Sequence, residues 1–310
     1  MEEGMAENSR GPDAPLRARS LLIDFASAAT VALSCLCLAA TLQLLAPAAA
    51  ASEAQPNRVR AEYYPPKNPA HQPIYDMLRE KRALEKLQEV FSPFKLPIDL
   101  KLQIGPCDGV ANAWYNRPNI SVCYEYLEEI MKTLPSENAP KGITRSDAMI
   151  GQFFYVFAHE FGHAAFDVFA MPVLGNEEDA ADQFATYIML QFGKDDARRL
   201  ITGAVFAYER YVQNPQVSAP LAAFSDVHAP PAQRYFNMLC LAYGADEALF
   251  ADLVERGYLP KTRARNCKRE YNQVAFAFRD LVTPHLDQQL ARQVLDKAWL
   301  APVPERTMPR

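Results

Sequence analysis

Residues 157–187 read FAHEFGHAAFDVFAMPVLGNEEDAADQFATY, an apolar segment followed by an acidic one. In the apolar part, His159 and His163 are four residues apart, so on a helix both imidazoles lie on one face. Glu160 lies beside them. The apolar flanks predict a buried helix, and buried imidazoles and carboxylates are costly unless they bind something. This H-E-x-x-H spacing predicts two metal ligands and a general base.

The alternative is an ordinary helix on which two histidines coincide, although the chain has only five histidines in all. Two imidazoles and a carboxylate around an open position favour zinc, with one ion per chain. Gly162 lies inside the motif, and the absence of a side chain there predicts the close approach of another backbone.

The acidic helix that follows MPVLGN offers candidates for a third ligand. Glu178 and Asp182 are four residues apart and face the same way on a helix. Glu178 would complete a site of two histidines and one glutamate, and Asp182 would accept the spare N–H of a ligand imidazole. Glu177 and Asp179 are predicted to point elsewhere, as charges at a helix N-terminus. A solvated acidic helix start is the alternative for all four.

Patterns in the rest of the chain predict an α+β fold. Residues 74–91 have helical periodicity, and residues 98–104 (IDLKLQI) alternate as a half-buried strand does. Two further extended pieces, near residues 112–115 and 120–123, flank a turn, and everything after Pro140 reads as helical. The sequence therefore predicts a domain over 74–310 with a small N-terminal sheet and a mostly helical body. A polar, proline-rich linker is predicted over 52–73.

Residues 1–51 predict export. No charged residue lies between Asp24 and Glu53, Arg17 and Arg19 precede this apolar run, and small residues at 48–50 follow it. This order is typical of a secretory signal peptide, which predicts a periplasmic or secreted protein. An apolar run of about 20 residues is also long enough for a retained membrane anchor, so association with a membrane stays open.

Four cysteines lie beyond the apolar run, at positions 107, 123, 240 and 267. An even number in an oxidising compartment predicts two disulfides. Sequence proximity favours Cys107–Cys123 and Cys240–Cys267, but no spacing requires that pairing. The net charge of −5 gives no electrostatic reason to expect a nucleic-acid partner.

The motifs HEFGH and EDAAD together resemble the gluzincin peptidases, in which a glutamate from E-x-x-x-D on a later helix completes the zinc site. The chain is more closely similar to a bacterial family assigned as metallopeptidases and otherwise of unknown function. The similarity covers most of residues 74–280 and includes the segments EEDAADQ, NAWY and QRYFNMLC. It implies a zincin-like fold, a zinc metalloendopeptidase activity and a peptide or protein substrate.

The resemblance also implies a substrate-binding strand. Gluzincins carry an Asn-Ala-aromatic segment on an edge strand that pairs with the substrate backbone, and Asn112 and Ala113 of NAWY match it. Such pairing depends little on the sequence of the bound peptide. The alternative is a plain strand end with Trp114 in the core.

A downstream histidine that stabilises the oxyanion is the last implied feature. His228, steadied by Asp226, matches it in chain order, although the two are closer together than in the best-known gluzincins. Alternatively, His228 caps the helix that begins at PPAQ, and Arg234 and Tyr235 are rival donors. His71 and His285 receive no role.

The sequence thus predicts an exported zinc metallopeptidase. The alternative is an exported, non-catalytic domain in which zinc only stabilises the fold. Glu160 disfavours the alternative, because a structural site needs no base and usually closes with four protein ligands.

Overall fold

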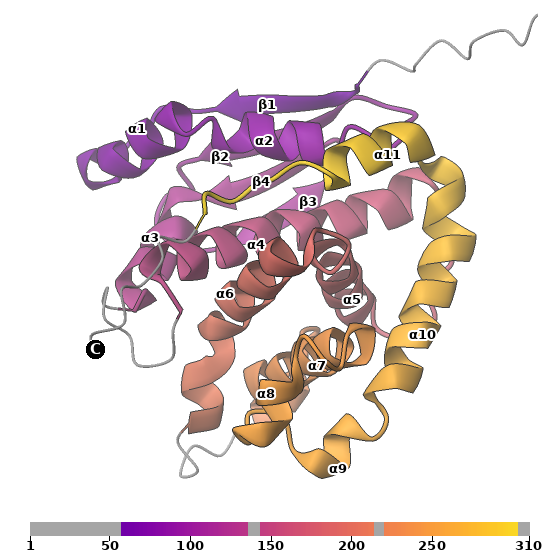
Figure 1. Ribbon diagram of the computed structural model, residues 1–310. Helices are drawn as coiled ribbons and strands as arrows, with labels where there is room; N and C mark the ends of the chain where they lie inside the picture. The colour runs from indigo at the N-terminus through magenta and orange to yellow at the C-terminus, as the bar shows by residue number, and fades with distance from the viewer. Residues whose placement is uncertain (1–56, 136–142, 214–219, 303–310) are drawn as a thin grey trace, which may run out of the picture. The chain divides into compact units, whose positions relative to one another are not determined.

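The computed structural model describes residues 57–135, 143–213 and 220–302, which belong to one compact unit (Figure 1). The predicted signal peptide or anchor at 1–51 lies outside the described residues. Within them, no helix is both long and apolar enough to cross a membrane. Four strands and a series of helices follow one another along the chain: β1 (Val59–Tyr63), η1 (Pro69–His71), α1 (Gln72–Glu80), α2 (Ala83–Val90), β2 (Leu100–Gly105), β3 (Ala113–Asn116), β4 (Asn119–Cys123), α3 (Tyr124–Thr133), α4 (Arg145–Val168), α5 (Glu177–Met189), α6 (Lys194–Gln213), η2 (Leu221–Phe224), α7 (Pro231–Ala245), α8 (Ala251–Glu255), α9 (Lys261–Ala264), α10 (Cys267–Ala277), η3 (Phe278–Val282), η4 (Thr283–His285) and α11 (Gln288–Leu295).

The predicted α+β fold with a small N-terminal sheet is confirmed. The strands are ordered β1-β2-β4-β3; the first three are parallel, and β3 runs antiparallel to β4 at the edge. Alternate residues of β2 (Leu100, Leu102 and Ile104) are fully buried, as the alternation in the sequence predicted. β3 is an edge strand in this sheet, so its outer side is free to pair with another chain.

The expectation of a linker over 52–73 does not hold from residue 59 onward. Residues 59–63 form β1, which pairs in register with β2 from Val59↔Leu100 to Tyr63↔Ile104. His71, which received no role, is buried at the end of η1. Proline-rich composition predicted a linker, but the long-range pairing with β2 makes this segment part of the domain.

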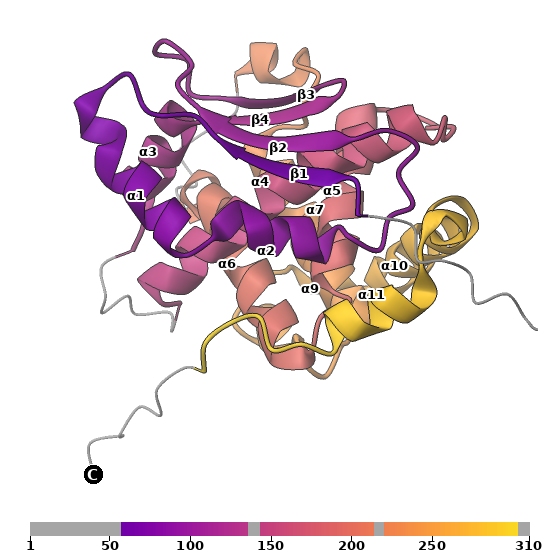
Figure 2. The same ribbon diagram turned by 90° about the horizontal axis from the view of Figure 1, so that it is seen from above.

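Helix α4 is the centre of the packing. Its N-cap Thr144 accepts a hydrogen bond from the backbone N–H of Asp147, and most of its residues are buried. Figure 1 shows the sheet above α4, with α5, α6 and α7 below it. Figure 2 shows the sheet from above, with its strands in the order β1-β2-β4-β3. Phe161 of α4 stacks on Phe91 with ring centroids 4.1 Å apart and also packs against Phe184 of α5. The motif helix is thus buried between the sheet and the helical body.

Both disulfides follow the pairing that sequence proximity favoured. Cys107–Cys123 ties the loop before β3 to the end of β4, and Cys240–Cys267 ties α7 to α10. The first bond therefore fixes the segment that leads into the edge strand.

Helices α4 and α6 touch through glycines. A Cβ on Gly203 would lie 2.0 Å from the carbonyl oxygen of Asp147, and one on Gly151 would lie 2.5 Å from the backbone nitrogen of Ala204. The backbones therefore approach more closely than any side chain allows.

We expect Gly203→Ala to lower the free energy of unfolding by about 3 kcal/mol or more, because the added methyl group forces α6 away from α4. Urea denaturation measures the change. Gly193→Ala is the matched control, since a Cβ there meets nothing within 4 Å. Equal stability of the two variants would contradict this packing.

Candidate metal centre

Helices α4 and α5 bring together the three predicted ligands. Nε2 of His159 lies 3.0 Å from Oε2 of Glu178. Nε2 of His163 lies 3.3 Å from the same oxygen and 3.3 Å from Nε2 of His159. Two imidazole nitrogens and a carboxylate oxygen that converge in this way fit a divalent metal such as zinc.

The close packing of α5 on α4 positions this group. Gly162 lies against α5, where an added Cβ would be 3.3 Å from Cα of Ala181. The close approach predicted for this glycine is therefore present, and it places the first turn of α5 over the two histidines.

Asn176, the N-cap of α5, has a part that the sequence did not reveal. Its side-chain oxygen accepts the backbone N–H of Glu178, and its Nδ2 donates to the carbonyl of Val227, 2.6 Å away. One side chain thus fixes the start of the ligand helix and the loop that carries His228.

Asp182 lies one turn beyond Glu178, behind the ligands. Its Oδ1 is 2.8 Å from Nδ1 of His159 and also bonds the hydroxyl of Tyr155. Arg234 donates two hydrogen bonds to the same carboxylate, at 2.6 and 2.7 Å. Burial raises the pKa of Asp182, but His159 and Arg234 outweigh it, so the pKa is lowered and the group is a carboxylate. Asp182 is therefore placed to fix the orientation and tautomer of His159.

The carboxylates of Asp182 and Glu178 change the pKa of His159. Burial lowers the pKa of His159, but hydrogen bonds with Asp182 and Glu178 outweigh burial and raise it to about 9. The pKa of Glu178 is lowered to about 2, chiefly by its hydrogen bond with His159. The carboxylates therefore favour a positive charge between Glu178 and the ring nitrogens of His159 and His163.

We expect Asp182→Asn to weaken metal binding by about 10–100-fold, because the partner of His159 changes from a charged carboxylate to a neutral amide. The same change should lower the free energy of unfolding by about 3 kcal/mol, because Arg234 is left without its charge partner. Competition with a chromophoric chelator and urea denaturation measure the two effects. Asp195→Asn, on the exposed start of α6, is the control. A folded variant with unchanged metal affinity would contradict the positioning role.

The position of Glu177 differs from the one that the sequence predicted. It was predicted to point away from the site, yet its Oε1 lies 2.7 Å from Nδ1 of His163. Glu177 and Glu178 are the first two residues of α5, and both side chains contact the histidines of α4. Each ligand imidazole therefore has its own carboxylate on its second nitrogen.

Glu160 connects the site to the edge strand. Its side chain is 7% exposed, and its carboxylate accepts the backbone N–H of Tyr115 in β3. Burial raises the pKa of Glu160, and His159 and His163 act against that shift. The carboxylate thus lies beside the ligands without being one of the converging atoms.

A second contact fixes β3 on α4. The hydroxyl of Tyr115 donates to Asp167, 2.5 Å away, and the guanidinium of Arg117 binds both carboxylate oxygens of Asp167 at 2.7 Å. Bidentate charge-assisted bonds of this kind are geometrically specific. Together with the Glu160 bond, they hold the edge strand in place along the motif helix.

The NAWY segment divides between the two sides of β3. The carbonyl of Asn112 accepts the N–H of Cys123, so the backbone of Asn112 faces β4. Because antiparallel pairing alternates, Ala113 and Tyr115 turn their backbone groups to the free edge. Trp114 is 38% exposed, so its predicted alternative place in the core is wrong. Of the two predicted substrate-binding residues, only Ala113 offers its backbone outward.

His228 lies on the loop between η2 and α7 and contacts the ligand Glu178. Its Nε2 lies 3.0 Å from Oε2 of Glu178, while Oδ1 of Asp226 accepts its backbone N–H and lies 3.2 Å from its Nδ1. The capping alternative is wrong, because α7 has Pro230 as N-cap and no side-chain cap. The rival donors are occupied elsewhere: Arg234 binds Asp182, and Tyr235 lines a separate cavity with Thr202.

An α+β fold that carries two histidines and a glutamate at one point, beside a buried glutamate, is typical of metal-dependent hydrolases. The chain belongs to the family described as "Putative metallopeptidase", whose model matches residues 63–282. No curated protein and no solved structure shows significant similarity to the chain.

Proposed function

We propose that this protein is an exported zinc metalloendopeptidase, whose ligands are His159, His163 and Glu178. The observation that carries the proposal is the position of Glu160, buried beside the converging ligands and bonded to the free edge strand. A structural site would not need this carboxylate. Bound zinc supplies Lewis-acid chemistry: it lowers the pKa of water and polarises a carbonyl oxygen.

The residues of the chain have separate tasks in this reaction. Glu160 takes the proton from the attacking water and delivers it to the leaving amine. His228, steadied by Asp226, donates a hydrogen bond to the oxyanion. Asp182 and Glu177 hold the two ligand imidazoles, and the outward backbone groups of Ala113 pair with the substrate.

Two features support export. The disulfides Cys107–Cys123 and Cys240–Cys267 are typical of an oxidising compartment. The apolar run before residue 53 has the order of a signal peptide, and a retained run would place the same peptidase on a membrane surface.

Removal and return of the metal test the proposal. We expect the purified protein to cleave unstructured peptides at internal bonds, to lose this activity on treatment with a chelator and to regain it with one equivalent of zinc. Mass spectrometry of the products measures cleavage. Activity that survives complete removal of metal would refute the proposal, and zinc binding without cleavage would favour the structural alternative.

A further inference from the structure

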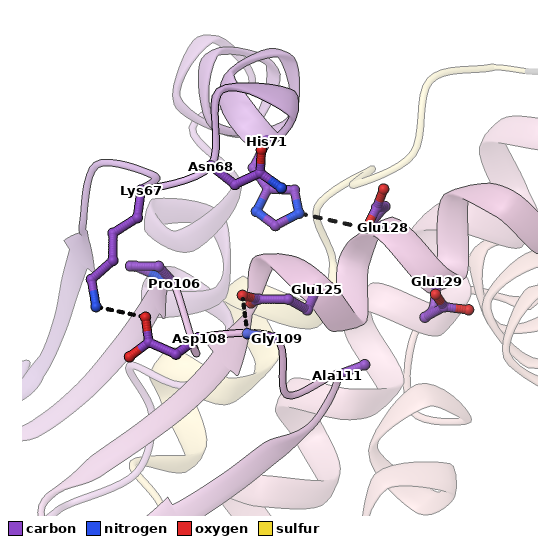
Figure 3. Close-up of a pocket in the computed structure, with 10 residues that line it drawn as sticks. All are labelled: Lys67, Asn68, His71, Pro106, Asp108, Gly109, Ala111, Glu125, Glu128 and Glu129. Atoms are coloured by element: carbon purple, nitrogen blue, oxygen red, sulfur yellow. Dashed lines mark hydrogen bonds and ion pairs between the residues drawn. The ribbon is translucent and has the colours of Figure 1, made fainter.

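A hollow of about 440 Å³ lies beside the loop that leads into the edge strand (Figure 3). Its walls come from the end of η1, the loop at 106–111 and one face of α3. Four of its lining residues are acidic, and Lys67, its one lining lysine or arginine, pairs with Asp108 at 2.7 Å. The rest of the acidic wall has no lysine or arginine partner among the lining residues and consists of three glutamates of α3, namely Glu125, Glu128 and Glu129.

His71 is a buried lining residue whose imidazole lacks a hydrogen bond among the described residues. The residue is 2% exposed, and neither ring nitrogen makes a hydrogen bond within the described structure. Its Nε2 approaches Oε2 of Glu128 only to 3.5 Å. Figure 3 shows the ring directed from η1 toward the glutamates of α3. A buried polar group without a partner is costly, so this arrangement points to a ligand that completes it.

The three glutamates of α3 differ in the partners of their carboxylates. Glu125 accepts the backbone N–H groups of Cys107 and Gly109, at 3.1 and 3.0 Å, and so supports the loop. Glu128 and Glu129 both pair with the exposed Lys132, at 3.4 and 3.0 Å, and Glu128 also lies 3.5 Å from Nε2 of His71. Exposed ion pairs of this kind are weak, so both carboxylates can exchange Lys132 for a ligand.

The size and charge of the hollow select the ligand. Its volume is in the range of about 300–1,000 Å³ that organic ligands occupy, well above the need of a single ion. Carboxylates on one wall bind a guanidinium or ammonium group through charge-assisted hydrogen bonds. The matching chemical class is an arginine or lysine side chain.

The position of the hollow connects it to the substrate. Gly109 and Ala111 line it, β3 begins at Ala113, and Tyr115 bonds the carboxylate of Glu160. A peptide paired with the free edge of β3 passes this loop about four residues, or about 13 Å, from Glu160. We propose that the hollow receives a basic side chain of the peptide substrate, about four residues from the cleaved bond. This specificity rests on the proposed peptidase function.

Matched peptides test the proposal. They differ only in an arginine, leucine or glutamate at the fourth residue on either side of the cleaved bond. At low salt we expect kcat/KM for the arginine peptide to exceed that for the glutamate peptide about tenfold on one side. In Glu128→Gln/Glu129→Gln the preference should fall below about twofold, while the leucine peptide is cleaved as before. These figures correspond to one or two partly exposed charge pairs. Glu255→Gln, on α8, is the control.

Equal rates for the three peptides, or a preference that survives in the double variant, would overturn the proposed specificity. The same peptides are also titrated against the Glu160→Gln protein, with fluorescence anisotropy as the readout. If no peptide is cleaved but the arginine peptide binds preferentially, the hollow is supported and the peptidase function fails. Binding without any charge preference would overturn the hollow as a basic-residue site.

Discussion

Replacement of Glu160 by glutamine is expected to lower kcat for peptide hydrolysis by about a thousandfold and to leave zinc bound. Loss of a general base removes about 10²–10⁴ in rate. Glutamine keeps an oxygen that can accept the N–H of Tyr115, so the bond between α4 and β3 survives. Because Glu160 is not one of the converging ligand atoms, the metal content should not change.

Steady-state kinetics and metal analysis on the same preparation measure the two quantities. Asp280→Asn, an exposed acid far along the chain, is the control for the loss of one negative charge. A Glu160→Gln protein with the kcat of the wild type would refute the assignment of the base. Loss of zinc together with activity would instead make Glu160 a ligand.

Replacement of Glu178 by alanine should weaken zinc binding more than the 10–100-fold that outer partners of a ligand contribute. Its Oε2 is the atom that His159, His163 and His228 all approach within 3.3 Å. Without it, two imidazoles alone hold the ion. Peptidase activity should fall with zinc occupancy.

The neighbouring Glu177→Ala is the matched comparison. Glu177 touches only the second nitrogen of His163, so its loss should weaken zinc binding by about tenfold, at the low end of the range for outer partners. Chelator competition ranks the two variants. If Glu177→Ala loses more affinity than Glu178→Ala, the assignment of the third ligand is reversed.

The sequence predicted that His159, His163 and Glu178 lie together, and it could do so because the spacings involved are local. The spacing of His159 and His163 and the spacing of Glu178 and Asp182 both follow from helix geometry alone. The alternation in β2 and the proximity of the cysteines are equally local and were equally informative.

The features that the sequence did not predict depend on contacts between distant segments. β1 exists through pairing with β2, some 40 residues later, and its own proline-rich surroundings suggest a linker. The bonds of Asn176 to Val227 and of Arg234 to Asp182 each span about 50 residues. Glu177 was misplaced because the first turn of a helix allows two neighbouring side chains to reach one site. The burial of His71 likewise follows from η1 packing against α3.

X-ray absorption spectroscopy of the zinc-loaded protein tests the central claim most directly, because it counts the ligands of the ion. The account predicts one zinc per chain with two imidazoles at about 2.0–2.1 Å, oxygen ligands from Glu178 and water, and no sulfur. His228, 3.0 Å from Glu178, is the residue whose binding would close the site. A third imidazole on zinc and no exchangeable water would contradict a catalytic centre and identify a structural one.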